Sequence, residues 1–315
     1  MSEVMLIGEP IVILTANELG NIQEVTNFTR SIAGAEINVA IGLTNLNHPV
    51  SYVTKLGGDP FGQYIENFLN DKGIDTSYVS YNNKVSTAFQ LKGKTEDGDP
   101  EVVYFRKGSA ASHLSKEDVA PVSLEGIKLI HITGIPPALS KGSREAIYEM
   151  IKKAKDAGIF ITFDPNIRPT IWDTKEEMIS VMNDIASKCD MILPGISEGK
   201  ILTGSDDPEK IADFYLSMGA KIVVIKLGAE GAFVKTGNES YKVPGFKVDK
   251  VVDTVGAGDG FAVGVLSGVL EGLTLRDAVT RGNAIGSLQV MVQGDNEGLP
   301  THETLEKYLN SYKLD

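Results

Sequence analysis

A glycine-rich turn runs directly into an apolar stretch at residues 253–268, which read DTVGAGDGFAVGVLSG. Gly256 and Gly258 leave backbone amides uncovered, and a helix start adds unpaired N–H groups and the positive end of its dipole. Such a place binds anions, phosphate above all. Asp259 falls in the first helical turn, where a carboxylate either caps the helix or faces a hydroxyl that attacks phosphorus. We expect the helix start to keep Asp259 ionised at neutral pH, and we expect an exposed amide and a positive φ at Gly258.

The length and composition of the chain allow one large domain or two ordinary ones. The chain has 315 residues, 42% of them hydrophobic, and a net charge of −12. This charge argues against a nucleic-acid or anionic-membrane surface, so local positive groups must hold an anionic substrate. The single cysteine excludes an intrachain disulfide, and no signal peptide or membrane-spanning apolar run is visible. We therefore expect a cytoplasmic protein that binds neither nucleic acid nor membrane.

Strand-like apolar runs alternate with helical patterns over most of the chain. The predicted strands cover residues 4–7, 50–56, 128–133, 159–163, 191–193 and 221–226. One predicted helix starts after residues 33–35, and another ends near residue 72. Further helices are predicted over 141–157, 175–187, 259 to about 270, and 273–291. A last helix is predicted after the polar loop at 293–298. This alternation predicts a parallel sheet with helices on both faces, and ligands bind at the carboxyl ends of the strands in such sheets.

Two segments depart from this rhythm and predict a second, smaller sheet. Residues 86–92 and 101–106 form a hairpin pattern around a polar loop, and residues 25–32 read as an exposed strand. We interpret them as a lid that stands off a single domain spanning residues 1–315, with lid segments at about 10–33 and 84–108. A projecting sheet has exposed edges, so we expect a homo-oligomer, either a dimer through the lids or a higher assembly.

Several polar residues follow predicted strands at the ligand-binding edge. Arg168, Glu198 and Lys226 each come shortly after a strand. The segment 226–231 reads as a hairpin turn, whose backbone can also contact a nucleotide. The small residues 33–35 either permit a close turn or let a ligand approach the backbone.

The string Asp-Thr-x-Gly-Ala-Gly-Asp-x-Phe at residues 253–261 resembles the signature of the ribokinase-like (PfkB) sugar kinases. The resemblance covers essentially the whole chain. It implies an α/β fold, a ribokinase-like three-layer α/β/α domain with a mainly parallel central sheet and a small β-sheet lid. It also implies that Asp259 is the catalytic base, that the amides of Gly256, Ala257 and Gly258 form the anion hole for the transferring phosphoryl group, and that ATP and Mg²⁺ are used.

Two further motifs are similar to family patterns, each with a departure. The Gly-Ala pair at 34–35 with Asn38 is similar to the family's Gly-Gly pair ahead of an asparagine, one glycine short. The family's Asn-x-x-Glu motif keeps its glutamate as Glu198 but has Gly195 in place of the asparagine. The resemblance implies that Glu198 contacts magnesium indirectly, through a bound water.

Residues 104–111 and 164–169, with Trp172, look like the corresponding stretches of 2-keto-3-deoxygluconate kinases within this family. That likeness implies a sugar site and a nucleotide site built from distant parts of the chain. The implied sugar site comprises Gly34, Asn38, Phe89, Tyr104, Arg106, Arg168 and Asp295. The implied nucleotide contacts are Asn166, Lys226, Gly228, Gly231, Gly256 and Gly258.

Arg106 and Arg168 carry the expectation of an acidic sugar. Each either pairs with a surface carboxylate, the usual fate of an arginine, or lies at least partly buried among its apolar neighbours. A buried guanidinium needs a partner, and a sugar-acid carboxylate suits its fork better than a neutral hexose does.

The resemblance thus implies an ATP-dependent kinase that phosphorylates 2-keto-3-deoxygluconate at its 6-hydroxyl. One alternative is a fructokinase or another sugar kinase of the family. An alternative of a different class is a non-catalytic sugar-sensing protein on the same fold, although a sensor has no need of a base at Asp259.

Overall fold

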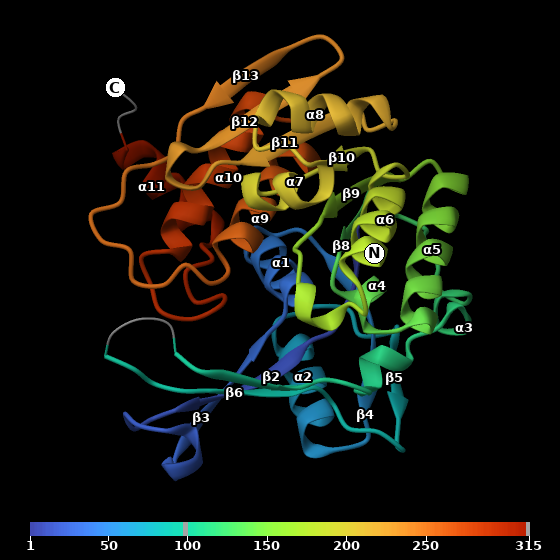
Figure 1. Cartoon of the computed structure of the whole chain (residues 1–315), viewed down its shortest axis with the longest axis vertical. Coiled ribbons are helices and arrows are strands. Elements are labelled where there is room, and N and C mark those ends of the chain that lie inside the picture. The colour runs from blue at the N-terminus through green and yellow to red at the C-terminus, as the bar shows by residue number, and fades with distance from the viewer. Residues whose placement is uncertain (97–99, 313–315) are drawn as a thin grey trace.

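The computed structural model describes residues 1–96 and 100–312, and its main feature is a large, mostly parallel sheet (Figure 1). Its strands are β1 (Val4–Ile7), β4 (Val50–Gly57), β5 (Val79–Asn82), β8 (Leu129–Thr133), β9 (Phe160–Asp164), β10 (Met191–Ile192), β11 (Ile222–Lys226), β12 (Ala232–Thr236) and β13 (Ser240–Val243). Their order is β13-β12-β11-β10-β9-β8-β1-β4-β5. Neighbours pair in parallel from β5 to β11 and antiparallel from β11 to β13.

Helices cover both faces of this sheet, because strand residues alternate between two apolar cores. Leu6 packs into one core and the next residue, Ile7, packs into the other. The first core receives α1 (Ala35–Asn45), α2 (Pro60–Asp71), α9 (Ala257–Leu270), α10 (Leu275–Gln289) and α11 (His302–Ser311). The second receives α3 (Lys116–Val119), α4 (Pro136–Leu139), α5 (Lys141–Asp156), α6 (Lys175–Ala186), α7 (Ile196–Thr203) and α8 (Pro208–Ser217). The predicted three-layer α/β/α architecture is confirmed.

A smaller sheet joins two segments that are far apart in the sequence. It consists of β2 (Ile11–Ala16), β3 (Phe28–Ala33), β6 (Phe89–Lys92) and β7 (Val102–Phe105), in the order β3-β2-β6-β7. β2 pairs antiparallel with β3 and parallel with β6, while β6 and β7 form the predicted antiparallel hairpin. The hairpin's predicted polar loop includes residues 97–99, which lie outside the described residues. Figure 1 shows this sheet running across one end of the molecule, away from α8.

The strand predictions needed corrections. β2, β5 and β13 were not predicted as strands. The exposed strand expected over 25–32 begins only at Phe28, and a short 3₁₀ helix, η1 (Ile22–Glu24), precedes it. The other 3₁₀ helices described are η2 (Ala110–His113), η3 (Pro169–Ile171) and η4 (Gly228–Glu230). No helix within residues 1–96 and 100–312 combines the length and apolarity that a membrane span needs.

Helices α1, α9 and α10 pack unusually closely. A Cβ at Gly264 of α9 would lie 2.5 Å from the Cα of Gly282 in α10. A Cβ at Gly42 of α1 would lie 2.4 Å from the side chain of Val263 in α9. Such approaches are possible only without side chains at those positions. This packing holds α1 and α9 side by side, so that both helix starts reach the carboxyl ends of the central strands.

Candidate active site

The starts of α1 and α9 meet at one carboxylate, Asp259. The side-chain amide of Asn38, on α1, donates a hydrogen bond of 2.8 Å to Oδ2 of Asp259. The amide of Asn166, in the turn after β9, donates to Oδ1 over 3.4 Å. The structure therefore joins three residues predicted from separate parts of the sequence. Asn166, expected from the resemblance to contact the nucleotide, lies against the carboxylate.

The electrostatic setting of Asp259 differs from the expectation. Burial raises the pKa of Asp259 to about 7, the hydrogen bond from Asn38 opposes that rise, and the charges of Asp164 and Lys226 act in opposite directions. The expectation of full ionisation at neutral pH was wrong, because desolvation of the carboxylate outweighs the helix dipole. Protonated and ionised forms of Asp259 coexist near neutral pH.

The glycine turn before Asp259 begins α9 with a left-handed residue. Gly256 is the N-cap residue with φ of 75°, and a Cβ there would lie 2.1 Å from the carbonyl oxygen of Asp295. The positive φ expected at Gly258 thus occurs at Gly256, and Gly258 lies inside the helix without a positive φ. A Cβ at Gly258 would lie 3.6 Å from Nζ of Lys226, so an ammonium group stands beside the turn. The amide of Ala257 donates to the carbonyl of Thr254 over 3.4 Å, so the amides of Gly256 and Gly258 together with this cation suit an anion best.

Lys226 is the cation at the centre of several carboxylates. It ends β11, and its Nζ lies 2.5 Å from Oδ2 of Asp164 at the end of β9. Burial opposes the charge of Lys226, but the charges of Asp164, Glu198 and Asp259 prevail and raise its pKa. The lysine therefore stays charged at the edge where the predicted phosphate site lies. Asp164 was missed by the sequence prediction, although a carboxylate directly after an apolar strand was a usable signal.

Both carboxylate oxygens of Glu198 accept hydrogen bonds from backbone N–H groups. Its Oε1 accepts the N–H of Ile167 at 2.8 Å, and its Oε2 accepts the N–H of Gly195 at 2.6 Å. Burial raises the pKa of Glu198, and the charge of Lys226 opposes the rise. Glu198 thus fixes the turn that carries Asn166 to the start of α7, a structural role that the sequence prediction did not include.

The predicted nucleotide glycines lie in the turn between β11 and β12, which pair as the predicted hairpin. Gly228 and Gly231 have φ of 63° and 94°. A Cβ at Gly231 would lie 2.1 Å from the carbonyl oxygen of Val243. The turn follows directly from Lys226, and within it Gly228 is exposed, whereas Gly231 is buried against the chain that follows β13.

The predicted sugar residues of the smaller sheet differ in exposure. Phe89 stacks on Phe105 with ring centroids 4.5 Å apart and meets Phe61 at 5.4 Å. Tyr104 is 51% exposed and faces away from that cluster by the alternation of β7. Phe89 thus has an evident packing role.

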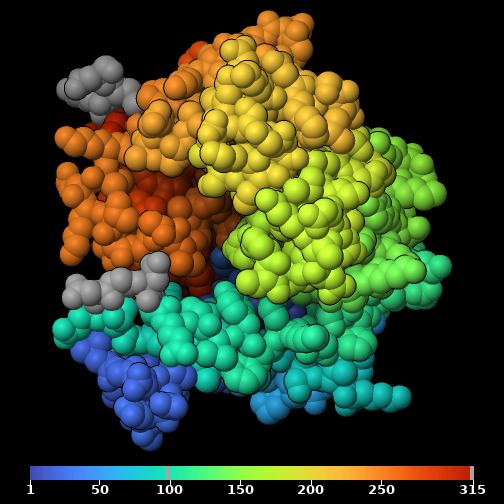
Figure 2. All heavy atoms as spheres, viewed as in Figure 1, coloured from blue at the N-terminus to red at the C-terminus, as the bar shows by residue number. Residues whose placement is uncertain are grey.

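Two further predicted sugar residues lie close to the helix starts. Gly34, with φ of 138°, is the N-cap residue of α1. Asp295 supplies the carbonyl next to Gly256, and burial raises the pKa of its carboxyl group to about 6 against the opposing charge of Lys92. Figure 2 shows a recess on this face of the molecule, between the teal atoms of the smaller sheet and the orange and yellow-green atoms of the main body.

The two arginines have different environments. Arg106 is 9% exposed and pairs with Glu9, a residue that sequence reasoning missed. Arg168 is exposed, and Nη1 donates to the carbonyl of Ile167 at 3.1 Å. The expected partial burial is found for Arg106 and is wrong for Arg168, which lies in the exposed turn before η3. A cavity of about 650 Å³ borders Arg106, Arg144 and Trp172.

Known proteins match nearly the whole length of this chain. A model of the pfkB family carbohydrate kinases matches residues 1–302. A 2-dehydro-3-deoxygluconokinase of Bacillus subtilis (strain 168) is 46% identical over 307 residues, which cover 97% of this chain and 95% of that protein. The crystal structure of a PfkB protein from Polaromonas sp. JS666 superposes with a TM-score of 0.90 at 42% identity, covering 97% of this chain and 99% of that one. A putative ribokinase II of E. coli in complex with ATP and Mg²⁺ superposes with a TM-score of 0.89 at 26% identity, covering 99% of this chain and 100% of that one.

Proposed function

This chain belongs to the pfkB family of carbohydrate kinases, and we propose that it phosphorylates 2-keto-3-deoxygluconate (2-dehydro-3-deoxygluconate) at the 6-hydroxyl with ATP. The observation that carries phosphoryl transfer is the position of Asp259 at the start of α9, held by two amides and flanked by a glycine turn. The near-full-length similarity to a 2-dehydro-3-deoxygluconokinase supports the choice of sugar.

Asp259 is the proposed catalytic base. As the sugar oxygen bonds to the γ-phosphorus, the hydroxyl proton passes to Oδ1 or Oδ2 of Asp259. Asn38 and Asn166 hold the carboxyl group in place, and the pKa of about 7 suits proton acceptance at neutral pH. The amides of residues 256–258 and the dipole of α9 stabilise negative charge on the transferring group.

The nucleotide is proposed to lie at the carboxyl end of β11. Lys226 attracts its phosphates, and the turn with Gly228 and Gly231 offers backbone contacts to the rest. Magnesium prefers oxygen ligands and keeps several waters, so it is bound mainly through phosphates. Glu198 keeps a lone pair on each oxygen, and Asp164 lies beside it, so these carboxylates fit water-mediated contact with the ion. Bound magnesium would neutralise phosphate charge.

The sugar is proposed to bind between the two sheets. Asn38 contacts Asp259, and Gly34 begins the same helix. Arg168 lies in the exposed turn before η3, and Arg106 directly follows β7. Tyr104, Phe89 and Asp295 remain proposed contacts from the smaller sheet and the polar loop.

A homo-oligomer formed through the smaller sheet is also proposed. Its support is the exposure of Val102, Tyr104 and Phe105 on the edge strand β7. A monomer mass alone in light scattering would contradict this oligomer.

The alternatives make different predictions in one assay. We expect ADP release with ATP, Mg²⁺ and 2-keto-3-deoxygluconate, and a product whose phosphate lies on the 6-oxygen by ³¹P–¹H NMR. A fructokinase releases ADP with fructose instead. A sensor binds a sugar without releasing ADP, so tight binding of the keto-acid with no ADP above the ATP background rules out the proposed reaction.

A further inference from the structure

A buried ion pair links two segments at the base of the smaller sheet, the connection between β1 and β2 and the segment that follows β7. Glu9, in the connection between β1 and β2, is 1% exposed. Its Oε2 accepts hydrogen bonds from Nε of Arg106, at 2.9 Å, and from Nη2. Its Oε1 accepts a hydrogen bond of 2.5 Å from the hydroxyl of Ser109. The carboxylate therefore has partners on both oxygens and no contact with solvent.

This pair lies against the proposed sugar site. A Cβ at Gly34 would lie 2.8 Å from the carbonyl oxygen of Glu9, so the two backbones touch. Glu9 is hydrogen-bonded to one edge of the guanidinium group of Arg106, and Arg106 also borders the cavity of about 650 Å³. Two of the five N–H groups of Arg106 are used by Glu9, which leaves three for a ligand.

The charges of the two arginines are consequently unequal. The positive charge of Arg106 is cancelled by the buried carboxylate of Glu9 in contact with it, so a sugar acid placed beside Arg106 meets a neutral pair. Arg168 forms no ion pair with any residue of segments 1–96 and 100–312. Its charge nevertheless reaches the site, because it lowers the pKa of Asp259.

We propose that Glu9 is a specificity-determining residue, which cancels the charge of Arg106 and leaves Arg168 as the cation that selects an anionic sugar over a neutral one. Arg106 then acts as an oriented set of N–H donors for any sugar. The proposal rests on the proposed sugar site. It assigns different roles to two arginines that the sequence suggested were equivalent.

A charge cycle across the pair tests the proposal. The measured quantity is the acid ratio, which is kcat/KM for 2-keto-3-deoxygluconate divided by kcat/KM for fructose, for the full chain with saturating ATP and Mg²⁺. Glu9→Gln keeps an acceptor for Arg106 and frees its charge, so the acid ratio should rise about tenfold or more. Arg106→Gln leaves Glu9 unpaired, and the acid ratio should fall by a similar factor. The double variant restores neutrality, so its acid ratio should return to within about threefold of the parent.

Two further variants serve as controls. Ser109→Ala removes a hydrogen bond but keeps the ion pair, so the acid ratio should stay at the parent value. Arg168→Gln removes the free cation, so the acid ratio should fall by about tenfold or more. A merely structural role of Glu9 would change kcat/KM for both sugars by the same factor.

Several outcomes would overturn the proposal. They are an unchanged or lower acid ratio in Glu9→Gln, and a double variant whose acid ratio stays as low as that of Arg106→Gln. If the single variants do not fold, the double variant is compared with the parent: an acid ratio within about threefold of the parent supports the proposal, and a fall of about tenfold or more overturns it. The proposed function is judged separately, because it depends on the acid ratio of the parent, whereas this proposal depends only on how the ratio changes.

Discussion

At the scale of single residues, the site depends on how a few side chains are partnered. Asp259 takes hydrogen bonds on both oxygens, yet burial still raises its pKa to about 7. Glu36, in the first turn of α1, shows the same effect, because burial raises its pKa to about 7 even though Thr133 donates to it. Carboxyl groups this close to neutrality are typical of catalytic sites.

The first prediction concerns Asp259→Asn. The substitution keeps the shape but removes the proton acceptor, so kcat should fall by about 10²–10⁴-fold while ATP binding persists. A carboxyl with a raised folded-state pKa makes the fold less stable as pH rises from its ordinary value towards 7. At about pH 8 the Tm of Asp259→Asn should therefore equal or exceed that of the parent. Turnover within a few-fold of the parent would show that Asp259 is not the base.

The second prediction is the pH dependence of the parent enzyme. Only ionised Asp259 can accept the proton, so kcat/KM should fall below an apparent pKa of about 7 with a slope of about one. Steady-state rates across the acid limb measure this directly. Because kcat/KM reports groups of the enzyme before the sugar binds, an acid limb near the ordinary carboxyl pKa would contradict a raised pKa of Asp259 as the controlling group.

The third prediction uses two glycines of one turn as a matched pair. Gly256→Ala forces a Cβ into a positive-φ residue 2.1 Å from a carbonyl oxygen, so Tm should fall along with activity. Gly258→Ala meets only the flexible end of Lys226 at 3.6 Å, so Tm should hold while kcat/KM falls, because the methyl group enters the proposed anion site. Equal Tm values for the two variants would count against the turn geometry, and full activity in Gly258→Ala would count against the anion hole.

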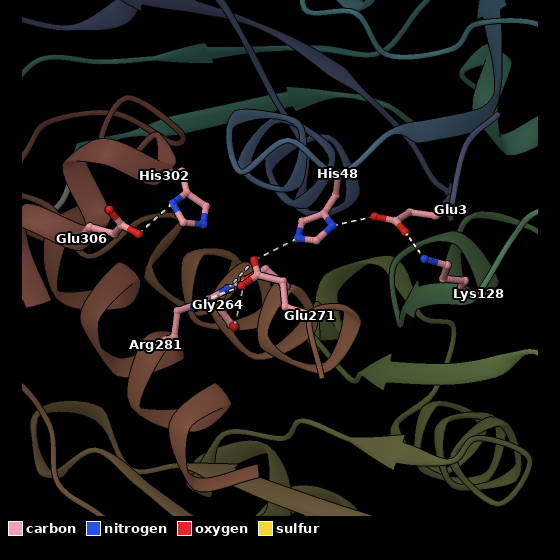
Figure 3. A network of polar contacts seen from close by, with 9 residues as sticks. Glu3, His48, Lys128, Gly264, Glu271, Arg281, His302 and Glu306 are labelled. Atoms are coloured by element: carbon pink, nitrogen blue, oxygen red, sulfur yellow. Dashed lines mark hydrogen bonds and ion pairs between the residues drawn. The ribbon is translucent and has the colours of Figure 1, made fainter. Parts of the chain in front are cut away.

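At the scale of elements, the far ends of α1 and α9 are joined by a buried histidine. His48 follows α1, and its Nδ1 lies 2.6 Å from Oε1 of Glu3, while Nε2 lies 3.4 Å from Oε1 of Glu271 at the end of α9. Figure 3 shows His48 between these two carboxylates, with Lys128 and Arg281 extending the network. The ring of His48 thus lies between the far ends of the same two helices that meet at Asp259.

The fourth prediction compares two histidines. His48→Ala leaves two partly buried carboxylates without their shared partner, so the free energy of unfolding should fall by about 1–3 kcal/mol. His302 makes a similar contact with Glu306 at 3.4 Å, but its side chain is 41% exposed, so His302→Ala should cost about 0–1 kcal/mol. Urea unfolding of both variants gives the comparison, and equal losses would contradict a joining role for His48.

The fifth prediction concerns the smaller sheet as a lid. If it closes over bound sugar, amides of residues 86–96 and 100–106 should exchange more slowly with saturating 2-keto-3-deoxygluconate. Hydrogen exchange read by mass spectrometry tests this, with the buried strand β8 as an internal reference. Identical exchange with and without sugar would leave the sheet as a rigid shelf.

At the scale of the whole molecule, periodicity predicted the parallel sheet well because its strands are separate apolar runs. It missed β2, although the apolar run IVIL stands in the sequence, and β5, whose residues VSYN are only partly apolar. Motif resemblance predicted Asp259 and Asn38, which lie in contact in the structure, but it could not show that Arg106 is paired with Glu9. That pairing joins residues far apart in sequence, so only the folded chain brings it into view. The pKa of Asp259 likewise depends on burial, which local sequence does not report.

The central claim is that this kinase acts on an acidic sugar. The most direct test is kcat/KM of the unmodified chain for 2-keto-3-deoxygluconate and for fructose under the same ATP and Mg²⁺ conditions. A lost charge-assisted hydrogen bond costs roughly 10–150-fold, so we predict that the keto-acid exceeds fructose by at least about two orders of magnitude. A value for fructose equal to that for the keto-acid would contradict the claim and favour a fructokinase.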